Sequence, residues 1–289
     1  MIQVSRVWGG RAILGEGPVW DSFGAVLWFV DIKDRKVHRL DPATRATTRW
    51  DAPEQIGWIL PARNGKLIAG LQSGLASFDP LDGSFETLCE IEAHLPTNRL
   101  NDATIAADGA IFFGSMDDGE AATTGRYYRW DGRTATPLAI DPVRITNGPA
   151  LSPDQRSLYN VDTVEGVVYV ADLDHAGRVV SNRVFARIDP ADGYPDGCIT
   201  DRAGNVWLGL WGGWRARLYS PDGDVLREVR LPVSNVTKIA LGGPDLKTAF
   251  VTTACAGLDA SELARQPDAG CIFSFEVDIP GIVTVGATS

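Results

Sequence analysis

The sequence has few of the residues that nucleophilic catalysis usually needs. Its 289 residues include three histidines and four cysteines, and they contain no GxSxG, HExxH, CxxC or phosphate-binding glycine motif. These absences argue against a serine or cysteine nucleophile paired with a histidine base. We expect His38, His94 and His175 to lie at the surface, because they fall in outer-strand or connecting positions.

Positive charge and long apolar runs are also scarce. The sequence has 27 Lys and Arg against 37 Asp and Glu, and this net charge of −10 argues against a nucleic acid or a membrane as partner. No apolar run approaches the ~20 residues of a membrane span, and the first residues lack the apolar core of a signal peptide. The cysteines are scattered, so we expect reduced thiols and a cytoplasmic location. We also expect a monomer.

A repeated segment fills nearly the whole chain. In each copy a polar residue or a glycine precedes a short apolar stretch, an Asp/Gly turn and a second apolar stretch. The copies begin 41 to 49 residues apart, at Glu16, near Gly57, at Asn101, Asn147 and Asp196, and near Thr237. Several short strands at a period of roughly 40 to 50 residues are typical of propeller blades.

Each copy also contains a later hairpin with its own turn, which brings the expected count to four strands. Four strands in each of six copies predict an all-β protein, a six-bladed β-propeller, with residues 1–289 as a single domain. Residues 2–8 precede the first copy and have the character of a lone strand. Because an unpaired outer edge invites aggregation, we predict that they form the outermost strand of the last blade, beside residues 272–277.

The first strand of each propeller blade lines the central channel, so the six starting residues should converge on one axis. Five of them are polar, and two carboxylates in a narrow channel repel each other unless a cation neutralises them. Oxygen donors from Glu, Asn and Asp suit Ca²⁺, Mg²⁺, Mn²⁺, Zn²⁺ or Fe²⁺. Three protein ligands leave positions open for water and substrate. The alternative is a structural channel in which these residues bind backbone groups or trapped water.

Two connections between strands are longer or more unusual in sequence than the others, residues 116–125 and residues 211–214. Loops on a rigid scaffold often carry binding residues, which makes these two candidates for a binding role. The alternative is that both are ordinary hairpin turns.

Five segments resemble, in order, the motifs of the gluconolactonase/regucalcin (senescence marker protein-like) family of sugar lactonases: residues 14–20, 99–102, 146–148, 194–197 and 241–245. Within that family the chain looks most similar to pentonolactonases such as bacterial xylonolactonase. The resemblance covers essentially the full length. It implies a six-bladed propeller that hydrolyses an aldonolactone, a small-molecule sugar lactone, with one divalent metal ion.

The resemblance also implies roles for particular residues. Glu16, Asn147 and Asp196 correspond to the metal ligands, and Arg99 and Asn101 to residues that bind the substrate. The family often has an acidic substrate-binding residue after a Gly-Thr-Met stretch, which is Gly-Ser-Met at residues 114–116 here. Three acidic residues compete for that role, and Glu120 is favoured over Asp117 and Asp118.

These parts imply a mechanism. The metal would polarise the lactone carbonyl and lower the pKa of a bound water. Asp196 would serve as both ligand and general base, and Arg99 would stabilise the developing oxyanion or hold the ring oxygens.

Other classes of function share some of these features. An aryl-ester or organophosphate hydrolase would keep the metal but prefer an apolar pocket, which Trp58, Trp211 and Trp214 are available to line. A non-catalytic calcium-binding propeller would keep the site without turnover. A protein-binding platform would not need carboxylates that converge on the axis.

Overall fold

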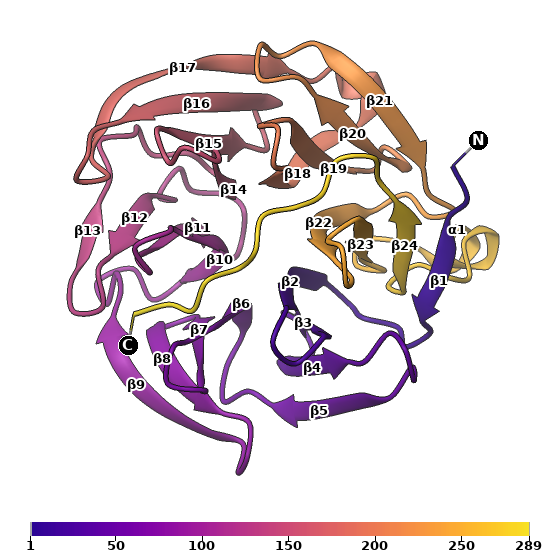
Figure 1. The fold of residues 1–289 in the computed structure, drawn as a ribbon, viewed down its shortest axis with the longest axis horizontal. Coiled ribbons are helices and arrows are strands. Elements are labelled where there is room, and N and C mark those ends of the chain that lie inside the picture. The colour runs from indigo at the N-terminus through magenta and orange to yellow at the C-terminus, as the bar shows by residue number, and fades with distance from the viewer. Residues whose placement is uncertain (1, 289) are drawn as a thin grey trace.

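The chain folds into six four-stranded antiparallel sheets arranged as blades around a central axis (Figure 1). This computed structural model describes residues 2–288. Met1 and Ser289, which the expected domain of residues 1–289 includes, lie outside the described residues. The prediction of an all-β, six-bladed propeller is confirmed.

The first four blades follow the chain, each from the axis outwards. The first blade contains β2 (Gly15–Asp21), β3 (Val26–Asp31), β4 (Lys36–Leu40) and β5 (Thr47–Asp51). The second contains β6 (Ile56–Pro61), β7 (Leu67–Leu71), β8 (Gly74–Asp79) and β9 (Ser84–Glu90). The third contains β10 (Asn98–Ile105), β11 (Ile111–Asp117), β12 (Tyr127–Trp130) and β13 (Ala135–Pro137). The fourth contains β14 (Thr146–Leu151), β15 (Ser157–Asp162), β16 (Val167–Leu173) and β17 (Val179–Arg187).

The last two blades complete the ring. The fifth contains β18 (Tyr194–Thr200), β19 (Val206–Trp211), β20 (Arg215–Tyr219) and β21 (Val225–Arg230). The sixth contains β22 (Val236–Gly242), β23 (Thr248–Thr253), β24 (Ile272–Glu276) and, as its outermost strand, β1 (Ser5–Trp8). Among the described residues, two short helices lie in connections, the 3-10 helix Pro190–Asp192 and α1 (Ala260–Arg265). Between residues 2 and 288, no helix has the length and apolar character needed to cross a membrane.

The ring is closed by pairing the two ends of the strand order. Strand β1 lies antiparallel to β24, with Ser5 opposite Ser274 and Arg6 opposite Phe273. The predicted position of the N-terminal strand is therefore confirmed, although the strand begins at Ser5 and not at residue 2. The preceding residues Ile2 and Val4 are outside the ladder, and both pack against the apolar cluster of the last blades.

All six inner strands have an irregularity in their register at the same level of the ring. The shifts fall between Glu16 and Val19, Ile56 and Trp58, Leu100 and Ala103, Asn147 and Ala150, Pro195 and Cys198, and Val236 and Ile239. A β-bulge bends its strand and re-aims the side chains beside it. The bulges thus lie at the level of the ring where the repeat copies begin.

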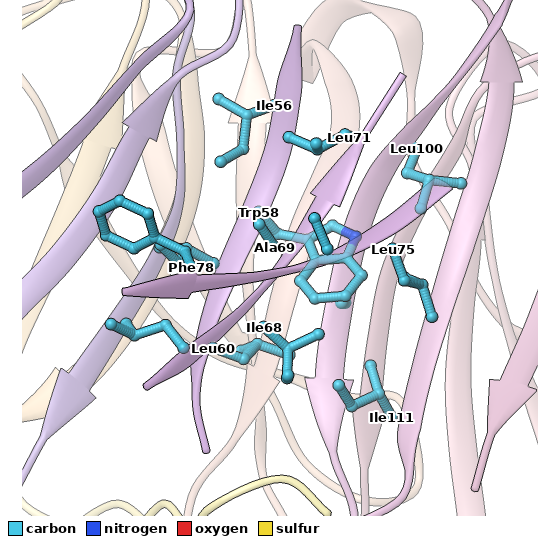
Figure 2. Close-up of a cluster of buried hydrophobic side chains, with 14 of the residues drawn as sticks. Ile56, Trp58, Leu60, Ile68, Ala69, Leu71, Leu75, Phe78, Leu100 and Ile111 are labelled. Carbon is cyan, nitrogen blue, oxygen red and sulfur yellow. The ribbon is translucent and has the colours of Figure 1, made fainter. Parts of the chain in front are cut away.

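The apolar core lies between neighbouring blades. Figure 2 shows part of it around Trp58, with Leu71, Leu100 and Ile111 drawn nearby. The Trp58 ring lies 6.0 Å from the Phe113 ring of the third blade, measured between centroids. A Cβ atom on Gly70 would fall 2.1 Å from Cε2 of Trp58, so only glycine leaves room for the indole. Trp58 thereby packs the second blade against the third.

The segment after β24 runs back across one face of the ring towards the second and third blades (Figure 1). The Ala287 N–H donates to the Pro61 carbonyl oxygen at 2.8 Å, and the Thr288 N–H donates to the Gly109 carbonyl oxygen at 2.9 Å. The C-terminal segment therefore joins the last blade to the second and third.

His38 differs from its expected surface position. Its side chain is buried, stacked on Phe29 at 4.7 Å between ring centroids and edge-on to Trp8 at 5.2 Å. Burial lowers the pKa of His38 to about 4. The prediction was wrong because Trp8, on the strand that closes the ring, covers the first blade.

Candidate active site

A cavity of about 500 Å³ lies on the axis, at the end of the ring where the inner strands begin. Among its lining residues are all six that the sequence singled out: Glu16, Arg99, Asn101, Glu120, Asn147 and Asp196. They come from four different blades and from the loop after β11. The fold therefore brings together residues up to 180 positions apart in the chain.

The three expected metal ligands are almost completely buried. Glu16 on β2, Asn147 on β14 and Asp196 on β18 are 4%, 4% and 6% exposed. The Asn147 amide is oriented by two neighbours, because its Nδ2 donates to Thr163 Oγ1 at 3.0 Å and its Oδ1 accepts from Asn101 Nδ2 at 3.1 Å. A carbonyl oxygen has two lone pairs, so Oδ1 keeps one for another partner.

The two axial carboxyl groups are strongly perturbed. Burial raises the pKa of Glu16 to about 8, and the negative charge of Asp102 adds to this shift. Burial also raises the pKa of Asp196 well above its usual value, with further contributions from the charges of Glu16 and Asp102. Because two neighbouring buried carboxylates repel each other, ionising both costs considerable free energy unless a cation neutralises them.

The chemistry of this donor set fits a divalent cation. Within residues 2–288 no group of three or more His, Cys, Asp or Glu side chains is placed to hold an ion. An ion on the axis would therefore take the amide oxygen of Asn147 as its third ligand beside Glu16 and Asp196. An all-oxygen set of this kind suits hard cations such as Ca²⁺, Mg²⁺ and Mn²⁺.

Arg99 is held rigidly in the wall of the cavity. Its guanidinium is buried, with Nη1 donating to Asn101 Oδ1 at 2.6 Å and Nε donating to Asp118 Oδ1 at 2.7 Å. Asp118 also accepts from Lys33 Nζ at 2.6 Å and from Gln55 Nε2 at 2.9 Å. Partial burial would raise the pKa of Asp118, but the bonds from Lys33, Gln55 and Arg99 lower it to about 2. Asp118 thus orients Arg99 through the hydrogen bond that it accepts from Nε.

The three acidic residues that compete for a substrate role have different surroundings. Asp117 closes its own turn, accepting from the backbone N–H groups of Ala121 and Ala122 at 3.0 Å each. Asp118 is engaged by Arg99, whereas Glu120 is exposed and lines the cavity. Glu120 is therefore the acidic side chain best placed to reach a ligand.

Trp211 lines the cavity, but the other two tryptophans considered for this role do not. Trp58 is enclosed in the core between blades, and Trp214 lies outside the cavity wall and is 38% exposed. Tyr194, which pairs with Trp211 across β18 and β19, also lines the cavity. Sequence reasoning did not single out Tyr194, although it begins one of the five motifs.

Gly57 and Thr237, at the remaining starts of repeat copies, have structural roles between blades. A Cβ atom on Gly57 would lie 2.4 Å from the carbonyl oxygen of Leu100, so glycine permits close packing of the second and third blades. Thr237 donates its hydroxyl to the carbonyl oxygen of Gly15 at 2.7 Å and joins the sixth blade to the first. Neither lines the cavity.

The fold and the cavity together define a six-bladed propeller with a carboxylate-bearing site on its axis. A model of the family described as the SMP-30/gluconolactonase/LRE-like region matches residues 14–255, and the chain belongs to this family. The resemblance stated from the motifs is confirmed.

Curated relatives and a solved structure agree with this assignment. The chain is 35% identical over 278 residues to an L-arabinolactonase of Azospirillum brasilense, covering 95% of this chain and 92% of the relative. It is 34% identical to a 6-deoxy-6-sulfogluconolactonase of Pseudomonas putida, covering 93% of each. Its fold matches that of a calcium-binding protein, regucalcin, from Agrobacterium tumefaciens with a TM-score of 0.95 and 26% identity, over 100% of this chain and 98% of the other.

Proposed function

We propose that this protein hydrolyses a sugar-derived lactone to the aldonic acid and that it uses one divalent metal ion. The observation that carries the proposal is the convergence of Glu16, Asn147 and Asp196 beside Arg99 and Asn101 in one axial cavity. The family, and two relatives named as lactonases, support the reaction class.

Glu16, Asn147 and Asp196 would hold the ion, which when bound supplies Lewis acidity toward a carbonyl oxygen and lowers the pKa of a bound water. Asp196 is the proposed general base and accepts a proton from the attacking water. The water oxygen bonds to the lactone carbonyl carbon, and the ring C–O bond then breaks. The proton passes to the leaving ring oxygen, which becomes a hydroxyl group of the aldonic acid.

Arg99 provides a fixed hydrogen-bond donor at the wall of the cavity, and Asn101, whose two amide N–H groups already donate to Thr146 and Asn147, offers the remaining lone pair of its Oδ1 as an acceptor. Because Asp118 and Asn101 already hold the guanidinium, Arg99 needs little reorganisation when negative charge develops on a substrate oxygen. Glu120 is proposed to accept hydrogen bonds from substrate hydroxyl groups. Apart from Glu16 and Asp196, the charged side chains that line the cavity are Lys33, Arg99 and Glu120, and Asp118 pairs with both Lys33 and Arg99.

Other lining residues of the cavity favour a sugar ring. Trp211 and Tyr194 present aromatic surface beside Val164 and Ile145. Aromatic faces pack against the C–H faces of sugar rings while the hydroxyl groups turn to polar partners. A volume of about 500 Å³ accommodates a lactone of five or six carbons, which is the size that the two relatives' names indicate.

A non-catalytic calcium-binding role is the second candidate. It is favoured by the close structural likeness to a regucalcin described as a calcium-binding protein. The two candidates share the same ligands and differ only in turnover.

The test is a panel of pentono- and hexonolactones assayed by acid release. Protein stripped with a chelator is reloaded separately with Ca²⁺, Mg²⁺, Mn²⁺, Zn²⁺ or Fe²⁺, and an aryl ester and an organophosphate serve as competing substrates. We expect metal-dependent turnover of lactones, abolished in Glu16→Gln. Metal binding without turnover of any lactone would favour the calcium-binding role, and faster turnover of the aryl ester or organophosphate would favour another ester hydrolase.

A further inference from the structure

A buried ion pair crosses the axis next to the proposed metal ligands. Lys238 Nζ donates to Asp102 Oδ1 and, at 3.1 Å, to the carbonyl oxygen of Ala103. The Lys238 side chain is 6% exposed and that of Asp102 is 1% exposed. Lys238 lies on β22 of the sixth blade and Asp102 on β10 of the third, which are opposite each other in the ring (Figure 1). The pair therefore spans the full width of the channel.

This pair separates two cavities. The upper cavity is the candidate active site, and a lower one of about 190 Å³ extends to the C-terminal segment, residues 282–285. Lys238 and Ala103 line the lower cavity, and in the described part of the chain the two cavities share no lining residue. The ion pair thus lies between the two cavities, at the level between Asn101 and Ala103, and neither of its residues lines the candidate active site.

The chain makes room for the lysine directly beside a proposed ligand. A Cβ atom on Gly197 would lie 2.5 Å from Cγ of Lys238, so the lysine stem passes against the backbone next to Asp196. Glycine at this position is required by the stem, not by a turn. Lys238 is therefore part of the wall that positions Asp196.

Asp102 acts electrostatically on both axial carboxyl groups. Its charge contributes to the raised pKa values of Glu16 and Asp196. Its second oxygen, Oδ2, is buried without a hydrogen-bond partner among residues 2–288. Glu16, Asp196 and Asp102 bring three carboxyl groups to the axis, and Lys238 brings a positive charge that pairs directly with Asp102.

We propose that Lys238 is a positioning residue: it holds the Asp102 carboxylate below the ligand level and, as a fixed positive charge, weakens the affinity of the site for a divalent cation. This inference rests on the metal site proposed above. A third carboxylate on the ion would occupy a coordination position that water or the lactone needs. Lys238 keeps that position open.

The test is Mn²⁺ binding, measured by calorimetry on the stripped full-length protein. We expect Lys238→Met to bind Mn²⁺ about ten-fold more tightly, because the site loses a positive charge in a poorly screened interior. We expect Asp102→Asn to bind about ten-fold more weakly, and the double variant to lie near the wild type. Lys66→Met, which removes a lysine outside both cavities, should leave the dissociation constant unchanged.

A merely structural role makes the opposite prediction for Lys238→Met. Loss of an ion pair that only supports the fold would loosen the ligands, so binding would weaken, and weaker or unchanged binding overturns the inference. If Lys238→Met does not fold, Lys238→Gln carries the same test, since it keeps a hydrogen-bond donor without the charge. Wild type that binds Mn²⁺ through Glu16, with no tightening in the lysine variants, rejects this inference alone. Absence of Mn²⁺ binding in the wild type rejects the metal site as well.

Discussion

The core of the second blade and the axial site are neighbours with opposite compositions. Trp58 is 1% exposed and Glu16 is 4% exposed, and a Cβ atom on Gly17 would lie 3.0 Å from the Cα atom of Trp58. The first region consists of interlocking apolar side chains from two blades (Figure 2). The second collects carboxyl and amide groups from several blades.

The difference separates stability from function. Burial of apolar surface contributes about 25 cal/mol per Å², so the core between blades is where the ring gains stability. Burial of carboxyl groups costs free energy unless they are paired, and the raised pKa values of Glu16 and Asp196 reflect that cost. Substitutions in the two regions should therefore have opposite consequences.

The largest expected effect is on stability, from Trp58→Ala. Removal of an indole that fills the space over Gly70 should lower the free energy of unfolding by about 3–5 kcal/mol. Denaturant unfolding measures this, with Phe23→Ala, a side chain 97% exposed, as the control. The Trp58→Ala molecules that stay folded should keep their metal. Loss of metal from the folded variant under native conditions would contradict the separation of stability from function.

Asp196→Asn should have the reverse effect. Loss of a general base typically lowers kcat by 10² to 10⁴-fold, and Asp196 is also a proposed ligand, so we expect a loss above 10²-fold. Stability of the metal-free protein should not fall, because the neutral amide is cheaper to bury. Steady-state kinetics and denaturant unfolding measure the two effects, with the exposed Asp222→Asn as control. Near-normal kcat would remove Asp196 from the mechanism.

The pH dependence of stability tests the burial of His38 in the apolar core. The folded protein has a His38 pKa of about 4, whereas the unfolded chain titrates near 6.5, so the unfolded state binds more protons between these values. Stability should consequently fall as the pH falls, by about 2 kcal/mol between pH 7 and pH 5. In His38→Phe this loss of stability between pH 7 and pH 5 should be smaller by about 2 kcal/mol. An unchanged slope would show that His38 is not buried in the neutral form.

Arg99→Ala should have the smallest of these effects. It separates metal binding from substrate binding within the site. The variant should keep its metal, because Arg99 contacts Asn101 and Asp118 and none of the three proposed ligands. One lost polar contact of about 1.4 kcal/mol corresponds to a ten-fold loss of kcat/KM on sugar lactones. A fall in kcat would indicate contact with developing charge, and a rise in KM alone would indicate contact with hydroxyl groups. Unchanged kcat/KM would remove Arg99 from the substrate site.

The blades and the axial residues could be predicted because both follow from a periodic pattern. Once the copies are aligned, Glu16, Asn147 and Asp196 fall within one residue of the same position at the bulge, and a propeller brings such positions to one axis. The closing strand followed from the same reasoning, since one strand was left over at the start of the chain.

Contacts between different blades could not be read from the pattern. Lys238 and Asp102 are 136 residues apart, and Lys33 and Asp118 are 85 residues apart, so neither pair has a local signal. His38 was assigned to the surface from its strand alone, without the side chain of Trp8 that covers it. What was missed is therefore a set of contacts between side chains that lie far apart in the sequence.

The most direct test of the central claim is the metal content of the wild type, Glu16→Gln and Asp196→Asn. Elemental analysis after dialysis should find about one equivalent of a divalent metal in the wild type and in Asp222→Asn. Both axial variants should lose it while remaining folded, because each leaves a single carboxylate with the Asn147 amide. Full metal occupancy in both axial variants would contradict the account.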